Sequence, residues 1–157
     1  MKNRLKGVTL LETVIYIGLF SLITIMILNF MLTAQESTTR TMRKSLIHQS
    51  KEFVLGHIDS TLNSASFIDR DSSVFNDVNG VLQVNISGED KQYAISDSVL
   101  YYDSIPITPS SILVEGFLLE PTYDNGGEVI GVLITTTLRS NGDQSISEEI
   151  NFLFTLR

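Results

Sequence analysis

The sequence predicts an α+β fold in which one long N-terminal α-helix, first transmembrane and then amphipathic, packs on a C-terminal antiparallel β-sheet. Three observations predict this fold. Residues 8–32 form an apolar run with a single charge, that of Glu12. Apolar side chains then recur three, four and seven positions apart as far as Ala65, which is the spacing of one helix face. After Gly80 apolar and polar residues alternate, as in strands with one buried face.

The apolar run is long enough to cross a membrane as a helix. Its 25 residues would extend about 37 Å, against a hydrocarbon layer of about 30 Å. Three basic residues precede it, Lys2, Arg4 and Lys6, and the positive-inside rule keeps such residues in the cytoplasm. We therefore expect a single-pass protein with residues 33–157 outside the cytoplasm. A secretory signal would have a shorter apolar region, followed by a cleavage site of small residues.

The helical pattern continues beyond the apolar run to about residue 66. One stripe of apolar residues repeats along this second half, namely Ile47, Val54, Ile58, Leu62 and Ala65. Charged and polar residues occupy the positions between them, which is typical of a helix with one buried face. The sequence thus predicts three parts: a leader over residues 1–7, a membrane helix over residues 8–32, and a head over residues 33–157 that begins with this amphipathic helix.

Six strands are predicted in the second half of the chain, at residues 81–86, 92–95, 99–102, 112–119, 129–138 and 146–156. Short turn signals separate them, and the strongest is the pair Asn141 and Gly142, which favours a tight hairpin. We expect a single antiparallel sheet whose apolar face covers the stripe of the long helix.

Composition excludes several classes of function. Without residues 1–7 the chain has eight basic and 18 acidic residues, so it has no general attraction for phosphate backbones and direct nucleic-acid binding is not expected. The absence of cysteine excludes disulfides and thiolate metal sites.

No pattern of catalytic residues is present. There is no glycine-rich phosphate loop, nucleophile elbow or zinc-protease motif, so we expect neither an enzyme nor a cofactor or metal site. His48 and His57 are interpreted as helix-face residues. The segment from Asp124 to Glu128 fits either a calcium-binding loop or an ordinary Asn-Gly-Gly turn, and Asn85 lies in a glycosylation sequon.

The start of the apolar run carries the most specific motif. A small residue, Gly7, precedes the run, and a glutamate follows five positions later, in the order Lys6, Gly7, Val8, Thr9, Leu10, Leu11, Glu12. This segment resembles the class III signal of type IV pilins and pseudopilins. The resemblance implies that a prepilin peptidase cuts between Gly7 and Val8 and methylates the new amine of Val8. The sequence departs from the family in having Val8 where Phe is commonest, and Asn29 where major pilins often have Pro.

Glu12 is the predicted assembly residue. A carboxylate within a membrane span is costly, at least about 2.5–3.5 kcal/mol for comparable charges at the bilayer centre, so a partner is expected. The resemblance implies that this partner is the Val8 amine of a neighbouring subunit or of the same chain. Two other roles remain open: Glu12 can reach the lipid headgroups, or it can form a capping box with Thr9, three residues earlier.

The order of the predicted strands resembles minor pilins of the W and J types. The matching positions are Ile107, Thr108, Ile112, Val114, Phe117 and residues 129–157. This resemblance implies a minor subunit of a type IV pilus, a type II secretion pseudopilus or a DNA-uptake filament. Its expected partners are other pilin-like subunits, the prepilin peptidase, an inner-membrane assembly platform and the lipid bilayer. The alternative is a membrane-anchored ligand-binding module that does not polymerise.

Overall fold

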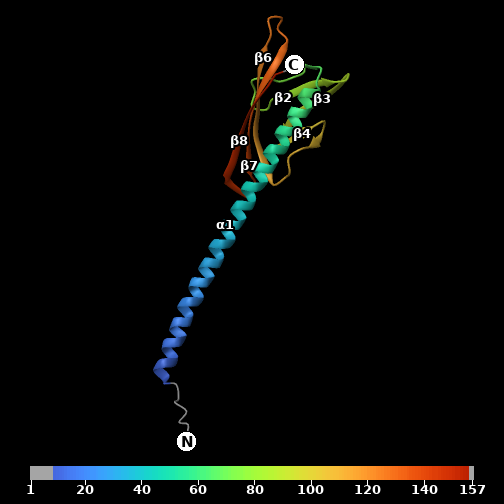
Figure 1. The fold of residues 1–157 in the computed structure, drawn as a ribbon. Helices are drawn as coiled ribbons and strands as arrows, with labels where there is room; N and C mark the ends of the chain where they lie inside the picture. Colours follow the sequence, from blue (N-terminus) through green and yellow to red (C-terminus); the bar gives the residue numbers. More distant parts are fainter. Residues whose placement is uncertain (1–8, 156–157) are drawn as a thin grey trace. The chain divides into compact units, whose positions relative to one another are not determined.

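The computed structural model describes residues 9–155, within which the chain forms one helix and eight strands (Figure 1). In order they are α1 (Leu10–Ser64), β1 (Phe67–Ile68), β2 (Val81–Ile86), β3 (Glu89–Ser96), β4 (Val99–Tyr102), β5 (Ile105–Pro106), β6 (Ile112–Tyr123), β7 (Val129–Ser140) and β8 (Asp143–Thr155). The chain divides into two compact units, Met1–Thr41 and Met42–Arg157. The long helix and the antiparallel strands confirm the predicted α+β class.

The two ends of α1 differ slightly from the prediction. The helix begins at Leu10, directly after Thr9, whose hydroxyl accepts a hydrogen bond from the Glu12 amide at 3.3 Å. It ends at Ser64, two residues before the expected end. The amide of Ser66 already donates to the Asn85 carbonyl at 2.8 Å, because the chain joins the sheet there as the short strand β1.

The predicted helix stripe forms part of the core of the second unit. Ile47, Val54, Ile58 and Leu62 are at most 2% exposed, and Ala65 is partly buried against them. The apolar faces of both sheets contribute to the same cluster, with Leu82, Tyr93 and Leu100 from one sheet and Phe117, Ile134 and Leu138 from the other. This packing confirms that the amphipathic half of α1 is covered by strands.

Two sheets are present where a single six-stranded sheet was predicted. Five strands pair in the order β1-β2-β3-β4-β5, and three pair in the order β6-β7-β8, with every pair antiparallel. The predicted bounds of β2 and β4 are confirmed. The two additional strands, β1 and β5, have only two residues each, which is too short for an alternating pattern to be recognised.

The sheets are joined through residues 76–80, which precede β2. Phe117 in β6 donates its amide to Val78 at 2.7 Å and accepts from Gly80 at 3.0 Å. A parallel bridge also pairs Asn79 with Phe117. Because this bridge uses the edge of β6, backbone hydrogen bonds continue from the smaller sheet into the segment that leads to the larger one.

Candidate functional site

The predicted cleavage site, Gly7 and Val8, lies outside the described residues, which start at Thr9. From Thr9 onward the structure shows a reciprocal cap at the start of α1. The Glu12 carboxylate oxygen Oε2 accepts from the amide of Thr9 at 3.3 Å and from its hydroxyl at 3.4 Å. In return, the Thr9 hydroxyl accepts from the Glu12 amide. This is the capping box that was one of the interpretations of Glu12.

The cap places the one carboxylate of the apolar run at the helix N-terminus. The partial positive charge of the first helical turn favours an anion there. Thr9 directly follows Val8 in the sequence, so an amine created at Val8 would be one residue away from the threonine that caps the helix. The arrangement therefore presents a negative charge near the position where the predicted cleavage would create a positive one.

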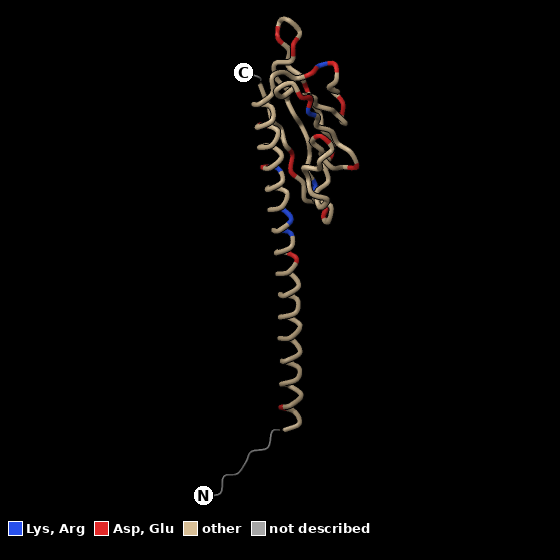
Figure 2. Tube along the Cα trace, turned by 90° about the vertical axis from the view of Figure 1, so that its right-hand side faces the viewer, with Lys and Arg blue, Asp and Glu red and all other residues tan. Residues whose placement is uncertain are grey.

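The apolar run itself is uncovered. Among residues 10–32 every large apolar side chain is exposed, Phe30 to the extent of 76%. This first part of α1 is long and apolar enough to cross a membrane. Figure 2 shows how few charges lie on it, because between Glu12 and Glu36 there are none. Such a surface requires an apolar environment.

The hydroxyl groups of this run are satisfied within the helix. Ser21 donates to the carbonyl of Ile17 at 2.8 Å, and Thr24 donates to that of Phe20 at 2.8 Å. Thr13 and Thr33 do the same to residues four positions earlier. Two other polar side chains of residues 10–33, Tyr16 and Asn29, make no hydrogen bond within the described part of the chain.

His57 belongs to a partly buried polar cluster that the sequence did not reveal. Its Nδ1 lies 2.7 Å from the Tyr93 phenol oxygen, which also lies 2.8 Å from the Thr61 hydroxyl. The Tyr102 ring packs edge-on against the imidazole at 4.8 Å between centroids. Burial raises the pKa of Tyr93. His57 and Thr61 are four residues apart, which places them on one helix face, but nothing in the sequence pairs them with β3.

His48, in contrast, lies on the surface, with a side chain that is 63% exposed. Its Nδ1 is 3.6 Å from Glu148 Oε1, and Lys51 Nζ is 3.7 Å from the same oxygen. These contacts connect α1 to β8. The exposed position fits the interpretation of His48 as a helix-face residue.

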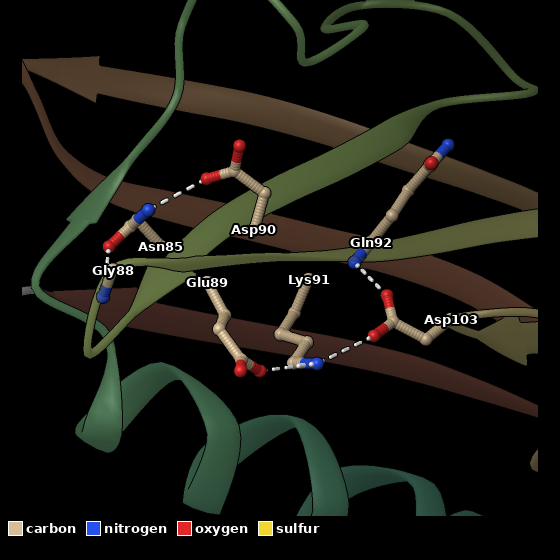
Figure 3. A network of polar contacts seen from close by, with 7 residues as sticks. All are labelled: Asn85, Gly88, Glu89, Asp90, Lys91, Gln92 and Asp103. Carbon is tan, nitrogen blue, oxygen red and sulfur yellow. Dashed lines mark hydrogen bonds and ion pairs between the residues drawn. The ribbon is translucent and has the colours of Figure 1, made fainter.

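The hairpins formed by β2, β3 and β4 carry polar contacts between side chains (Figure 3). Asp103 accepts from the Gln92 amide at 3.0 Å and pairs with Lys91 at 3.1 Å, while Lys91 also pairs with Glu89 at 3.1 Å. The hydrogen bond to Glu89, followed by that to Asp103, raises the pKa of Lys91. Lys91 thus lies between two carboxylates, and the group of three side chains keeps a net negative charge.

Both polar atoms of the Asn85 side chain, in the glycosylation sequon, make hydrogen bonds. Its Nδ2 donates to Asp90 at 2.7 Å, and its Oδ1 accepts from the Gly88 amide at 3.0 Å (Figure 3). The amide that a glycan would modify therefore closes the β2–β3 turn.

The segment from Asp124 to Glu128 is a compact turn that connects β6 to β7. Asp124 Oδ1 accepts from the amides of Gly126 and Glu128, each at 2.8 Å. Arg70 donates to the Gly127 carbonyl at 3.2 Å and lies 5.1 Å from the ring centre of Tyr123. Within residues 9–155 no three acidic or histidine side chains are grouped as metal ligands. The Asp124 carboxylate is engaged by its own loop.

A shallow cavity of about 550 Å³ lies over the β3–β4 hairpin. It is lined by Gln92, Ala94, Ser96, Tyr101, Asp103 and Ser104. The small side chain of Ala94 is paired across the strands with Tyr101, so an aromatic ring borders the recess. Polar groups on an open surface of this kind suit a weakly held polar ligand better than an enclosed substrate.

Comparisons with known proteins add no relative: no family model, no curated protein and no solved structure matches the chain. The resemblance to pilins therefore depends only on the residues described above. Of these, the ones that the structure describes are the Thr9–Glu12 cap and the exposed apolar helix. Both lie in the first unit, and together they form the candidate site.

Proposed function

We propose that the chain is a pilin-like, minor subunit of a type IV pilus, a type II secretion pseudopilus or a DNA-uptake filament. A prepilin peptidase would remove residues 1–7 and methylate Val8. The subunit would then wait in the cytoplasmic membrane, with its head outside the cytoplasm, until an assembly platform adds it to other pilin-like subunits. One observation carries this proposal: an apolar helix exposed on all sides, with a single carboxylate at its first turn.

The apolar helix surface and the carboxylate require two different partners. The apolar surface needs lipid before assembly and the helices of other subunits afterwards, since the described strands cover only the second half of α1. The carboxylate needs a positive charge once water is excluded. A neighbouring Val8 amine supplies that charge and fixes the axial position of one helix against the next, because a single stagger neutralises both groups.

The anchored ligand-binding module is the second candidate function. The cavity over β3 and β4 favours it, because an aromatic ring and several polar side chains border an open recess there. That function gives no role to Gly7, however, and it leaves Glu12 with no role beyond the helix cap. The two functions can be separated by whether Glu12 is needed for recovery with other subunits.

The test compares Glu12→Gln with Glu36→Gln in the full chain, at matched membrane levels. Glu36 is the matched control, because it is a carboxylate of the same helix that lies beyond the apolar run. Intact mass should show a methylated N-terminus at Val8 in both variants. Recovery in the sheared filament fraction should persist for Glu36→Gln and fall at least about 100-fold for Glu12→Gln, since an unpaired buried charge costs about 3–5 kcal/mol.

Two results would contradict the proposal. A mature chain that begins at Met1, or beyond residue 32, would exclude the pilin-type leader. Equal recovery of both variants would show that Glu12 acts only as a helix cap or as a headgroup contact.

A further inference from the structure

The recess over the β3–β4 hairpin gathers polar side chains that the fold does not use. The cavity of about 550 Å³ is lined by Gln92, Ala94, Ser96, Tyr101, Asp103 and Ser104. Among these, no hydrogen bond within residues 9–155 is made by the side chains of Gln92, Ser96, Tyr101 and Ser104. Donors and acceptors that lie together on one surface without protein partners are available to a polar ligand.

The strand register places the recess on the face of the larger sheet that is turned away from the core. Tyr93 is fully buried, so its neighbours on β3, Gln92 and Ala94, have their side chains on the opposite face. Ala94 is paired across the strands with Tyr101. Because the side chain of Ala94 is only a methyl group, there is room for a ligand beside the Tyr101 ring.

Backbone contacts hold the rim of the recess in place. The Asp103 amide donates to the Gln92 carbonyl at 2.9 Å, and the Asp103 carboxylate accepts from the Gln92 amide at 3.0 Å (Figure 3). Ser104 follows at a φ of 70°, where glycine is preferred in such a turn. Residues held at disfavoured backbone angles occur at ligand-binding sites, and a rim that is already ordered lowers the cost of binding.

The charges around the recess favour a neutral ligand. None of the residues that line it is basic. Asp103 belongs with Lys91 and Glu89 to a group that keeps a net negative charge, so an anion such as phosphate would be repelled. The Asp103 carboxylate is already paired with Lys91 at 3.1 Å, which leaves less of its charge to attract a cation.

We propose that this recess binds a neutral sugar, either free or as one unit of a glycan. A sugar ring has C–H groups on its face, which pack against an aromatic ring, and hydroxyls around its edge, which both donate and accept hydrogen bonds. The Tyr101 ring receives the C–H face, and Gln92 and Ser104 bind hydroxyls. The inference goes beyond the proposed function, because the recess lies in the second unit and gives the head a ligand whether or not the chain polymerises.

Ligand-observed NMR, with saturation of the protein's aromatic protons, tests this site on the full chain in a detergent that has no sugar headgroup. The probes are glucose, galactose, mannose and N-acetylglucosamine, each free and as its methyl glycoside. At least one should bind with a dissociation constant of about 1 mM, as expected for a partly enclosed ligand of about twelve to fifteen non-hydrogen atoms. Binding of the methyl glycoside identifies a unit of a glycan, and binding of the free sugar alone identifies a free sugar.

Three variants test whether the sugar lies in the recess. Tyr101→Ala removes the ring, and Ala94→Val fills the space beside it with a residue that strands accept; each should weaken binding at least about tenfold. Gln92→Ala should weaken binding about threefold to tenfold, by loss of one hydrogen bond. Tyr123→Ala and Gln144→Ala are the matched controls, since they remove the same types of side chain from outside the recess, and they should bind as the wild type does.

Several results would overturn the inference. One is the absence of binding by all four sugars at about 20 mM, and another is binding that is unchanged in both Tyr101→Ala and Gln92→Ala. Gln92→Ala keeps the backbone bonds to Asp103, so it tests the site even where Tyr101→Ala does not fold. Displacement of the sugar by an equal concentration of inorganic phosphate or spermidine would exclude a site for neutral ligands. The Glu12 comparison decides the proposed function separately, because these variants leave Glu12 intact.

Discussion

Several residues of the larger sheet adopt backbone angles that side chains disfavour. Two of its two-residue hairpin turns have positive φ at both positions without any glycine: Asp97 at 49° with Ser98 at 60°, and Asp103 at 46° with Ser104 at 70°. These are the angles of type I′ turns, in which Asn-Gly and Asp-Gly are preferred. Each such residue stores backbone strain, because its Cβ crowds the following carbonyl.

Replacing Ser98 by glycine should relieve that strain. We expect Ser98→Gly to raise the free energy of unfolding of the head by about 0.5–1 kcal/mol, because glycine occupies the left-handed region without a steric penalty. Ser96→Gly is the matched control, and it should lower stability by a similar amount because Ser96 lies within β3. Urea unfolding of the two variants measures both effects, and changes of the same sign would contradict the strain argument.

The Tyr93 phenol should make the stability of the head depend on pH in alkaline solution. Its pKa is raised in the folded state, so the unfolded chain releases this proton first as the pH passes about 10. The contribution of Tyr93 is thus complete below pH 10 and declines above it. Tyr93→Phe should cost about 1 kcal/mol at pH 8, by loss of its hydrogen bonds, and the cost should shrink by pH 11.

Urea midpoints at the two pH values measure this difference. Tyr101→Phe is a useful control at pH 8, since that phenol makes no hydrogen bond within residues 9–155 and its removal should cost less. A gap between wild type and Tyr93→Phe that stays constant up to pH 11 would contradict the prediction.

At the scale of elements, the junction of the two sheets depends on one close backbone approach. A Cβ added to Gly80 would overlap the carbonyl oxygen of Phe117. That oxygen accepts the Gly80 amide, so the contact cannot open without loss of the hydrogen bond. Because Gly80 has no side chain, residues 76–80 can lie close enough to β6 to form this hydrogen bond.

Gly80→Ala should accordingly destabilise the head by more than about 2 kcal/mol, by overpacking against backbone that cannot move away. Gly56→Ala should act in the opposite direction. Gly56 is a helical residue with open space where its side chain would be, and alanine is favoured over glycine there by about 0.8–1 kcal/mol. Thermal unfolding of both variants tests the pair, and a Gly80→Ala protein as stable as wild type would show that the junction is flexible.

Elements with a strong period were predictable from the sequence, and the junctions were not. The stripe from Ile47 to Leu62 repeats often enough to reveal the buried helix face, and β2 alternates clearly between Val81 and Ile86. The charged start of β3 does not show the alternating pattern of a strand, because Glu89 pairs with Lys91 of the same strand and Lys91 also pairs with Asp103, which follows β4. No local pattern distinguishes one sheet from two, since the bridge at Phe117 joins residues far apart in the sequence.

The candidate site was predictable only in part, for a related reason. The capping spacing of Thr9 and Glu12 is local, so the sequence shows it, and the structure confirms the cap. The His57 cluster requires Tyr93 from another element. Assembly through Glu12 concerns a second molecule and stays a prediction.

At the scale of the whole molecule, apolar surface and charge are divided between the two parts of the chain. Residues 10–32 contain one acidic residue, whereas residues 35–157 contain 17 of the 18. The helix stripe within the second unit is covered by strands, while the apolar run is uncovered. Association should therefore depend on the first part and solubility on the second.

A chain that consists of residues 35–157 should be a soluble monomer. Strands cover its apolar helix stripe, it lacks the fully exposed apolar run of residues 10–32, and its many acidic residues repel other copies. Sizing chromatography with light scattering measures this, with the full chain in detergent for comparison. Filaments or stable oligomers formed by residues 35–157 would show that the head carries an assembly surface of its own.

The hydroxyls that bond to their own helix have a consequence for the transfer of this helix between lipid, detergent and protein. Because Ser21 and Thr24 use carbonyls one turn earlier, their hydrogen bonds are the same in lipid, in detergent or against another helix. Moving the segment from one such medium to another breaks none of these bonds. The free energy of transfer between media therefore depends on the exposed apolar surface and on three other polar side chains, Glu12, Tyr16 and Asn29.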